Sequence, residues 1–321
     1  MTTFCTGRFL IDLPEGAKII GSARNTYRFA QIEKPRVMSR EQFTKELDDK
    51  EAKLKASKHD VDPSQFLKAV RPDDSSRVLA FWETPTAAGL VSVEGYKWMG
   101  GTRFLMVSEV DDDKQQLGIS RMQERINGFR PRLDTEIPSD PGYCFPGGFI
   151  ASPEWENEEA LTEFSLPGHP DAYVSVWFYP LAASKRDKPL LERMGGVVNS
   201  LGNLASSVHV LRKGDRTVAG YTGQEYLFTA PNGGGVPAHN FVWETQGEGT
   251  LEEPVVIIQM ETGTQDGKGN SQKPSLNNEE ALALWDRIVP TFRIRPTNAA
   301  QPKKTSDASP AIPTGPLRAA T

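Results

Sequence analysis

The two halves of the chain repeat a short series of residues, and this repetition restricts the possible folds more than any other feature. Three anchors recur in the same order, and each begins and ends on similar residue types. They are residues 5–14 with 144–153, 81–84 with 242–245, and 125–132 with 287–295. Because anchors that recur in register are typical of an internal duplication, we predict two similar tandem domains, residues 1–138 and 139–296.

Both halves also predict the same order of elements, which is a strand, a helix, several strands and a second helix. Ser39 and Gln42 have the spacing of a capping box and predict a helix through about Lys58, while Pro189 is well placed to begin the matching helix. A strand pattern precedes the first helix at residues 26–32, and another precedes the matching helix at residues 173–179. Strand patterns bounded by glycine and proline follow these helices, at residues 77–83, 90–98, 102–108, 224–228, 238–245 and 255–261. Closing helices are expected at residues 113–127 and 278–288. Hairpin-linked strands with two helices per half predict the α+β class, each domain a mostly antiparallel sheet packed with two helices.

Composition excludes several classes of protein. The chain has 321 residues, of which 37% are hydrophobic, enough for two cores. No stretch approaches the roughly 20 apolar residues of a membrane-spanning helix, and no signal peptide is visible at Met1. A net charge of −5 without a basic face disfavours nucleic-acid binding. Residues 297–321, rich in Ala, Pro, Thr, Ser and Lys, are expected to be a disordered tail.

Cys5 and Cys144 are the only cysteines, and they occupy equivalent places in the first anchor. Two cysteines are too few for a disulfide scaffold or a cysteine-based zinc site. We expect each to be a small buried hydrophobic residue. A bridge between them in an oxidising compartment remains the alternative.

The sequence offers no recognisable catalytic, metal-binding or cofactor-binding motif. No nucleophile elbow of the form G-x-S-x-G is present, and none of the four histidines has metal-ligand spacing. Trp82 and Trp243 of the second anchor are expected in the core, with Glu83 and Glu244 pointing the other way; a catalytic carboxylate pair is conceivable there. The arginines of the third anchor, Arg130 and Arg132 with Arg293 and Arg295, are expected to edge a strand and pair with acidic neighbours. We therefore predict that the chain is not an enzyme.

The run Cys5–Pro14, with the sequence CTGRFLIDLP, resembles the opening of the two-domain lipase-immunity proteins of type VI secretion systems. Residues 144–150, 164–170, 216–225 and 243–244 are similar to the C-terminal domain of that family. The resemblance implies an inhibitor that binds a cognate phospholipase effector of the Tle type and blocks access of lipid to its active site. It also implies a periplasmic location. A generic binding scaffold, or a hydrolase with an unrecognised site, are the alternatives.

Partner contacts cannot be transferred from the family, so we predict them from the residues themselves. Long loops and glycine-rich turns are frequent binding surfaces, which points to residues 263–274 and 231–236 and to the exposed face of the helix at 39–58. The candidate contact residues are Tyr226, Asn232, Gln265, Asp266, Lys268 and Lys273.

Overall fold

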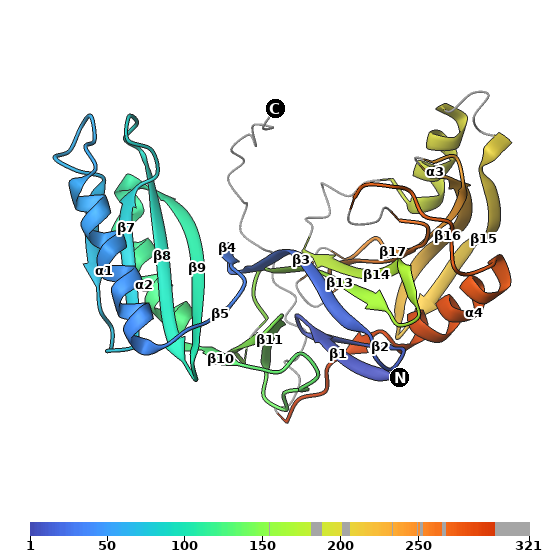
Figure 1. Ribbon diagram of the computed structural model, residues 1–321, viewed down its shortest axis with the longest axis horizontal. Coiled ribbons are helices and arrows are strands. Elements are labelled where there is room, and N and C mark those ends of the chain that lie inside the picture. Colours follow the sequence, from blue (N-terminus) through green and yellow to red (C-terminus); the bar gives the residue numbers. More distant parts are fainter. Residues whose placement is uncertain are drawn as a thin grey trace.

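The molecule is an arch built on one large antiparallel sheet (Figure 1). The computed structural model describes residues 1–298, apart from 154, 181–187, 201–205, 233, 249, 251–252 and 265–267. Thirteen strands form the main sheet, and two further sheets have three strands each. None of the described helices is long and apolar enough to cross a membrane.

We call the two ends of the arch the first and second lobes. The first lobe contains β5 (Arg36–Val37), α1 (Arg40–Ala56), β6 (Phe66–Val70), β7 (Ser76–Trp82), β8 (Leu90–Met99), β9 (Thr102–Asp111), a 3-10 turn (Asp112–Lys114) and α2 (Gln115–Asn127). The second contains β13 (Glu158–Leu166), β14 (His169–Tyr179), α3 (Leu190–Ser200), β15 (His209–Val218), β16 (Tyr221–Pro231), β17 (Pro237–Thr245), β18 (Val255–Glu261), α4 (Asn278–Ile288) and a 3-10 turn (Val289–Thr291). Between the lobes lie β3 (Lys18–Tyr27) and β4 (Ala30–Ile32).

The strand order of the main sheet is symmetric about its centre, because corresponding strands of the two halves occupy corresponding positions. It runs β15-β16-β17-β18-β14-β13-β3-β4-β9-β8-β7-β6, with β5 paired to β9. Outward from the central β13–β3 pair, each strand of one half has its counterpart at the same position in the other, and α1 and α2 correspond in chain order to α3 and α4. This arrangement is that of a two-fold duplication within one chain. The α+β class with two tandem, mostly antiparallel units is confirmed.

The second anchor of the repeat does not match this symmetry. Trp82 lies on β7, whose counterpart in the strand order is β16, whereas Trp243 lies on β17, the counterpart of β8. The prediction that both are core residues is nevertheless confirmed, because Trp82 is 6% exposed and Trp243 is fully buried. The second anchor therefore paired residues on strands that are not equivalent. A buried Trp next to a Glu is compatible with many strands, so this similarity does not identify counterparts.

Two short hairpins are exchanged between the halves. β1 (Thr2–Thr6) pairs with β2 (Phe9–Leu13), and β2 pairs with β19 (Arg293–Ile294), at the far end of the chain. In the equivalent sheet, β11 (Gly142–Phe145) pairs with β12 (Gly148–Ala151), and β12 pairs with β10 (Phe129–Pro131). The opening hairpin of each half thus holds the last strand of the other half. The predicted limits at residues 138 and 139 stay a prediction.

The arginines of the third anchor divide into two roles. Arg130 pairs with Glu136 at 2.8 Å, and Arg293 pairs with Asp12 at 3.1 Å, as expected. The expectation of acidic partners was wrong for Arg132 and Arg295. Both are buried, and both guanidinium groups donate to backbone carbonyl oxygens instead; Arg132 reaches residues 133, 134, 136, 145 and 148, and Arg295 reaches 138, 140 and 142. Burial lowers the pKa of each to about 10.

Cys5 and Cys144 form a disulfide, which corrects the expectation of two free buried thiols. They are buried, as predicted. They also hold equivalent hairpin positions, since Cys5 faces Leu10 across its hairpin and Cys144 faces Phe149. The bond therefore joins symmetry-related residues, as a bond on a two-fold axis does. Sequence alone could not select it because the two halves must first be folded against each other.

The predicted helices are present, with small changes at their ends. Ser39 caps α1 through the expected capping box with Gln42, and Asn277 caps α4 through a second capping box with Glu280. Two long strands were missed, β13 and β15, and so was most of a third, β3. The strand predicted at residues 26–32 is wrong as one element, because β3 ends at Tyr27, residues 28–29 form a turn and β4 begins at Ala30. Of the expected disordered tail, residues 299–321 lie outside the described residues.

Candidate partner-binding surface

The two loops proposed as contacts lie side by side because Asn232 joins them. Its side-chain Nδ2 donates to the carbonyl oxygens of Gly263 (2.9 Å) and Gln272 (3.0 Å). Its Oδ1 accepts from the backbone N–H groups of Gly234 (3.0 Å) and Val236 (3.2 Å). This amide makes four hydrogen bonds within the chain, which is its full capacity. Asn232 therefore shapes the loop surface, and its use as a contact stays a prediction.

The loop at residues 263–274 is also held at its two ends by the buried side chain of Asp171. Its Oδ2 accepts from the backbone N–H groups of Gly263 (3.0 Å) and Ser275 (3.1 Å). Burial alone would raise the pKa of this carboxyl, but these hydrogen bonds outweigh it and hold the pKa below its usual value. The ends of the loop are thus fixed to the sheet at the start of β14.

The other candidate contact residues differ in their availability. Lys268 and Lys273 are exposed, whereas Tyr226 on β16 is only 4% exposed, with its ring 5.5 Å from that of Phe228. Gln265 and Asp266 lie outside the described residues. The structure therefore brings Asn232, Lys268 and Lys273 to one pair of loops and leaves Tyr226 largely covered.

The helix at 39–58, now α1, uses its apolar side to cover the first lobe. Phe43 and Leu47 pack in a cluster with Leu79, Tyr96 and Leu105 of β7, β8 and β9. Its outward side carries charged pairs, such as Lys45 with Asp49 at 2.7 Å. Exposed pairs of this kind contribute little energy to folding or binding, so the outward side of α1 is a weak candidate.

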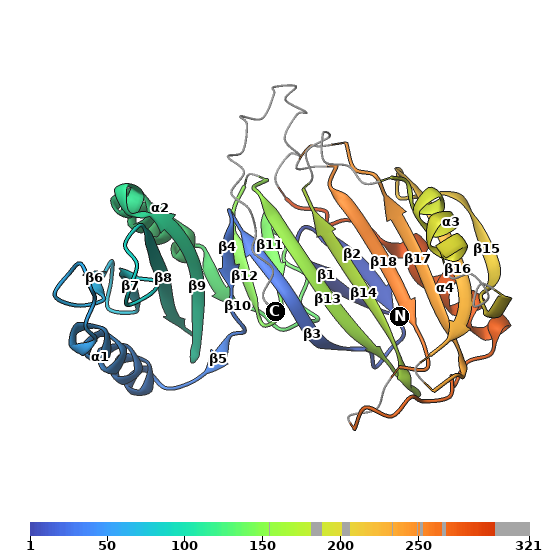
Figure 2. The same ribbon diagram turned by 90° about the horizontal axis from the view of Figure 1, so that it is seen from above.

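In the second lobe, the described residues leave the counterpart of the α1-covered surface partly exposed. α3 lies over β16 at one side, where the Leu191 N–H donates to Gln224 Oε1 (3.0 Å) and Arg193 forks onto Glu244 (2.7 and 2.6 Å). Seen from above, the strands β13, β14 and β18 carry no helix on this side among the described residues (Figure 2). We define the open sheet face as the partly exposed side chains of Leu161, Glu163, Tyr173, Trp177, Tyr179, Val242, Ile257 and Gln259.

Register places three apolar members of this face in one row across the sheet. Ile257 of β18 is opposite Trp177 of β14, which is opposite Leu161 of β13. At one end, Ile257 is opposite Glu244, where α3 begins to cover the sheet. At the other end Leu161 is opposite Arg24 of β3. The row therefore runs from the edge of α3 to the centre of the arch.

Trp177 is the best-anchored aromatic side chain of the open sheet face. Its Nε1 donates to Glu159 Oε1 at 3.0 Å, and the same oxygen accepts from Arg24 at 3.2 Å. The ring lies 4.6 Å from that of Tyr179, and the Arg24 guanidinium carbon is 5.8 Å from its centre. A tryptophan that is fixed in place yet partly exposed has the properties of a binding hot spot.

Sequence reasoning missed this face, although a signal existed. In β13 the residues alternate fully between buried and partly exposed positions. The outward positions of a half-solvated antiparallel strand are normally polar, yet Leu161, Trp177 and Ile257 are apolar. Apolar residues on both sides of a strand predict either burial or a contact surface.

The conceivable carboxylate pair is not assembled. Glu83 follows β7 in the first lobe and Glu244 ends β17 in the second, at opposite ends of the arch (Figure 1). Glu244 is instead paired with Arg193. Within the described ranges no group of three His, Cys, Asp or Glu side chains could hold a metal ion.

Comparison with known proteins decides the family. A model of the N-terminal domain of Tle cognate immunity protein 4 matches residues 2–139, and a model of its C-terminal domain matches residues 136–297. The chain belongs to the Tle cognate immunity protein 4 family. The immunity function that the sequence predicted is confirmed at this level. No curated protein matches the chain.

Solved structures of this kind match along nearly their whole length. One is a crystal structure of a Tle4–Tli4 complex, with 27% identity and a TM-score of 0.80. Another is the apo structure of TplEi, a T6SS immunity protein from Pseudomonas aeruginosa, with 27% identity and a TM-score of 0.79; a third is TplEi with a peptide called "L", with 27% identity and a TM-score of 0.74. Each covers 92% of this chain and 98% of its own.

As a member of the Tle cognate immunity protein 4 family, the chain is expected to act through a surface that contacts its partner. The candidate surface comprises the open sheet face and the two loops joined by Asn232. Both belong to the second lobe.

Proposed function

We propose that this chain binds a cognate Tle phospholipase effector and inhibits it without catalysis, by covering the path of lipid to the effector's active site. The observation that carries this proposal is the match of both halves of the chain to the immunity family, together with the similarity to an immunity protein solved in complex with its effector. A stoichiometric inhibitor needs a large, pre-formed contact surface and no reactive group.

The open sheet face supplies such a surface. It is rigid, because its side chains lie on central strands of a thirteen-stranded sheet. It combines aromatic rings with aliphatic side chains, the composition that is enriched at the centre of protein interfaces. The loops at 231–236 and 262–276 add polar groups beside it, as the rim of an interface does. We propose that the effector docks here and not on α1.

The proposed compartment is the periplasm. The Cys5–Cys144 disulfide supports it, because disulfides persist in oxidising compartments and are rare in the bacterial cytoplasm. An inhibitor of a lipid-degrading effector is also useful where that effector meets its membrane.

Titration of the effector's phospholipase activity with this chain tests the proposal. The cognate Tle phospholipase is assayed on lipid vesicles with increasing amounts of chain, and the mixture is run on a sizing column. We expect loss of hydrolysis near one chain per effector and co-elution of the two proteins.

Two variants sharpen this titration. Trp177→Ala removes the centre of the open sheet face and should raise the amount of chain needed for inhibition. Val61→Ala trims an exposed side chain of the first lobe, 68% exposed, and should behave as the wild type. Full phospholipase activity at a large excess of wild-type chain, with no co-elution, would contradict the proposal.

A further inference from the structure

The main sheet is narrow where the first lobe joins the rest of the arch. β4 pairs with β9 through only two residue pairs, Gln31 with Val107 and Ile32 with Met106. Its counterpart β14 pairs with β18 through seven. The turn before β4 also contains Arg28 and Phe29 at φ of 52° and 67°, a conformation that side-chain-bearing residues rarely adopt. This connection alone is a weak support for the first lobe.

The exchanged hairpins make a second connection beneath the sheet. Hairpin β11–β12 packs on the first lobe, with Phe145 against Phe104 (6.1 Å) and Phe129 (5.8 Å). Hairpin β1–β2 packs in the second lobe, with Phe9 against Phe178 at 5.1 Å. Any bond between the two hairpins therefore ties one lobe to the other.

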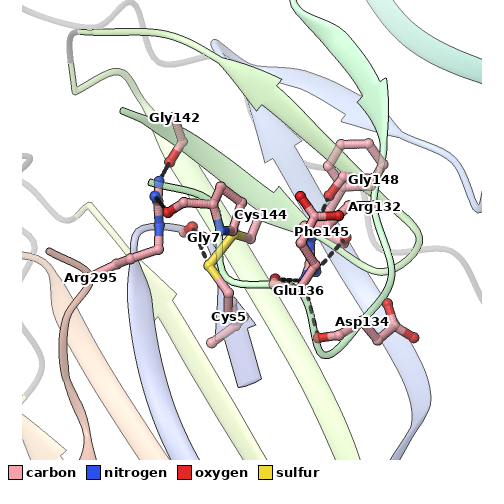
Figure 3. Close-up of a disulfide and its surroundings, with 12 residues drawn as sticks. Cys5, Gly7, Arg132, Asp134, Glu136, Gly142, Cys144, Phe145, Gly148 and Arg295 are labelled. Carbon is pink, nitrogen blue, oxygen red and sulfur yellow. Dashed lines mark hydrogen bonds between the residues drawn. A yellow bond between two sulfur atoms is a disulfide. The ribbon is translucent and has the colours of Figure 1, made fainter. Parts of the chain in front are cut away.

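Three features link hairpin β1–β2, or the residue after the β19 strand paired to it, with the segment that contains hairpin β11–β12 (Figure 3). Gly7 and Cys144 exchange two backbone hydrogen bonds of 2.8 Å, the disulfide links Cys5 to Cys144, and Arg295 binds the carbonyl oxygens of residues 138, 140 and 142. Position 7 requires glycine, because its φ is +56° and an added Cβ would lie 2.0 Å from the Phe178 ring. Of these links only the disulfide is covalent.

We propose that the Cys5–Cys144 disulfide fixes the angle between the two lobes, and that the chain reaches full affinity for its effector only after these cysteines are oxidised. This inference rests on the proposed function for its second part, while the first part concerns the free chain alone. Without the bond, the first lobe is held by the short ladder at β4, by the packing of hairpin β11–β12 on the lobe and by the hydrogen bonds between the two hairpins. Its orientation then varies more, and the surface presented to the partner is less well pre-formed.

Oxidation proceeds by thiol–disulfide exchange with a disulfide-bearing oxidant. The two thiols together lose two protons and two electrons, one S–S bond forms between Cys5 and Cys144, and the oxidant's S–S bond is reduced to two thiols. Cys5 is 2% exposed and Cys144 is fully buried, so the folded product is protected from reductants. The chain would thus become a tight inhibitor after it enters an oxidising compartment.

The test uses the full chain and two readouts. Small-angle scattering is recorded for the free wild-type chain, oxidised, and for the Cys5→Ala/Cys144→Ala double variant. Affinity for the effector is measured for both well below their melting temperatures. We expect a larger radius of gyration for the variant and a loss of affinity on the order of tenfold.

A matched control separates lobe orientation from general loss of stability. Met122→Ala removes a fully buried side chain beneath β8, away from the hairpins, and should lower stability without changing the scattering or the affinity. Identical scattering from the wild type and the folded double variant overturns the first part of the proposal. Equal affinities overturn the second part. If the oxidised wild type fails to bind the effector at all, the proposed function fails, and the scattering still decides the first part.

Discussion

The two lobes share one strand order but cover the sheet differently. In the first lobe α1, seventeen residues long, seals the surface over β7, β8 and β9 with Phe43 and Leu47. In the second lobe α3, eleven residues long, lies over β16, and the apolar row Leu161–Trp177–Ile257 stays partly exposed. The two halves thus share one scaffold, but a helix covers this face of the sheet in the first lobe, whereas in the second lobe the face stays partly exposed. On the proposed function, this difference in helix coverage is what leaves the second lobe a surface for the effector.

The largest expected effect comes from the exchanged hairpins. Phe9→Ala and Phe145→Ala each remove a buried ring and should each cost about 4 kcal/mol of stability. Native-state hydrogen exchange should place the main loss of protection in the second lobe for Phe9→Ala and in the first lobe for Phe145→Ala. Loss of protection mainly in the first lobe for Phe9→Ala, or mainly in the second lobe for Phe145→Ala, would contradict the exchange of the hairpins.

A second pair of variants compares the covered and the open face. Leu47→Ala opens a cavity under α1 and should cost about 3 kcal/mol of stability, with little change in effector affinity. Trp177→Ala should cost only about 1 kcal/mol of stability, because the ring is partly exposed, yet weaken binding on the order of tenfold or more. Urea unfolding and titration calorimetry measure the two quantities. Equal effects of both variants on binding would remove the distinction between the faces.

The helix caps provide a smaller comparison, with one capping box in each lobe. Ser39→Ala at α1 and Asn277→Ala at α4 should each lower stability by about 1 kcal/mol. If α1 serves only as a cover, Ser39→Ala leaves the inhibition of the effector unchanged. Midpoints of urea unfolding and the inhibition titration check both statements; a selective loss of inhibition in Ser39→Ala would make α1 part of the interface.

The smallest expected effect is the pH dependence that Asp73 of the first lobe contributes to stability. Asp73 is exposed, so partial desolvation raises the pKa of its carboxyl only slightly; hydrogen bonds from Lys97, Ser75 and Ser76 outweigh it and hold the pKa far below its ordinary value of 3.8. Because the pKa is lower in the folded than in the unfolded chain, the carboxylate stabilises the folded state fully above about pH 3.8. This contribution is lost as the pH falls below that value. Asp73→Asn should destabilise the chain at neutral pH, and the difference from wild type should shrink in acid. A constant difference from pH 7 to pH 3 would exclude this role.

Local patterns predicted most of the scaffold, because they depend on neighbouring residues. The capping box at Ser39 and the alternation in residues 255–261 each identify their element without tertiary information. The first and third anchors predicted the duplication because hairpin ends and closing strands use few residue types. The second anchor failed because Trp82 and Trp243 satisfy the same local rule on different strands.

The features that required the folded chain could not be predicted. Equivalent hairpins leave open which half each one joins, so neither the exchange nor the Cys5–Cys144 bond follows from the sequence. Asn232 is polar and lies in a turn, as many contact residues do. Its amide instead donates to carbonyl oxygens of a second loop, which is distant in the sequence and adjacent only in the folded chain. The open sheet face depends on how far α3 reaches, which strand patterns do not specify.

Side-chain footprinting of the complex tests the central claim most directly. Hydroxyl radicals label exposed aromatic rings, and the labelling of Trp177 and Tyr179 is compared between the free chain and the effector-bound chain. Trp98, partly exposed beside α1, is the internal reference. We predict strong protection of Trp177 and Tyr179 with no change at Trp98. Protection at Trp98, with Trp177 labelled as in the free chain, would contradict the account.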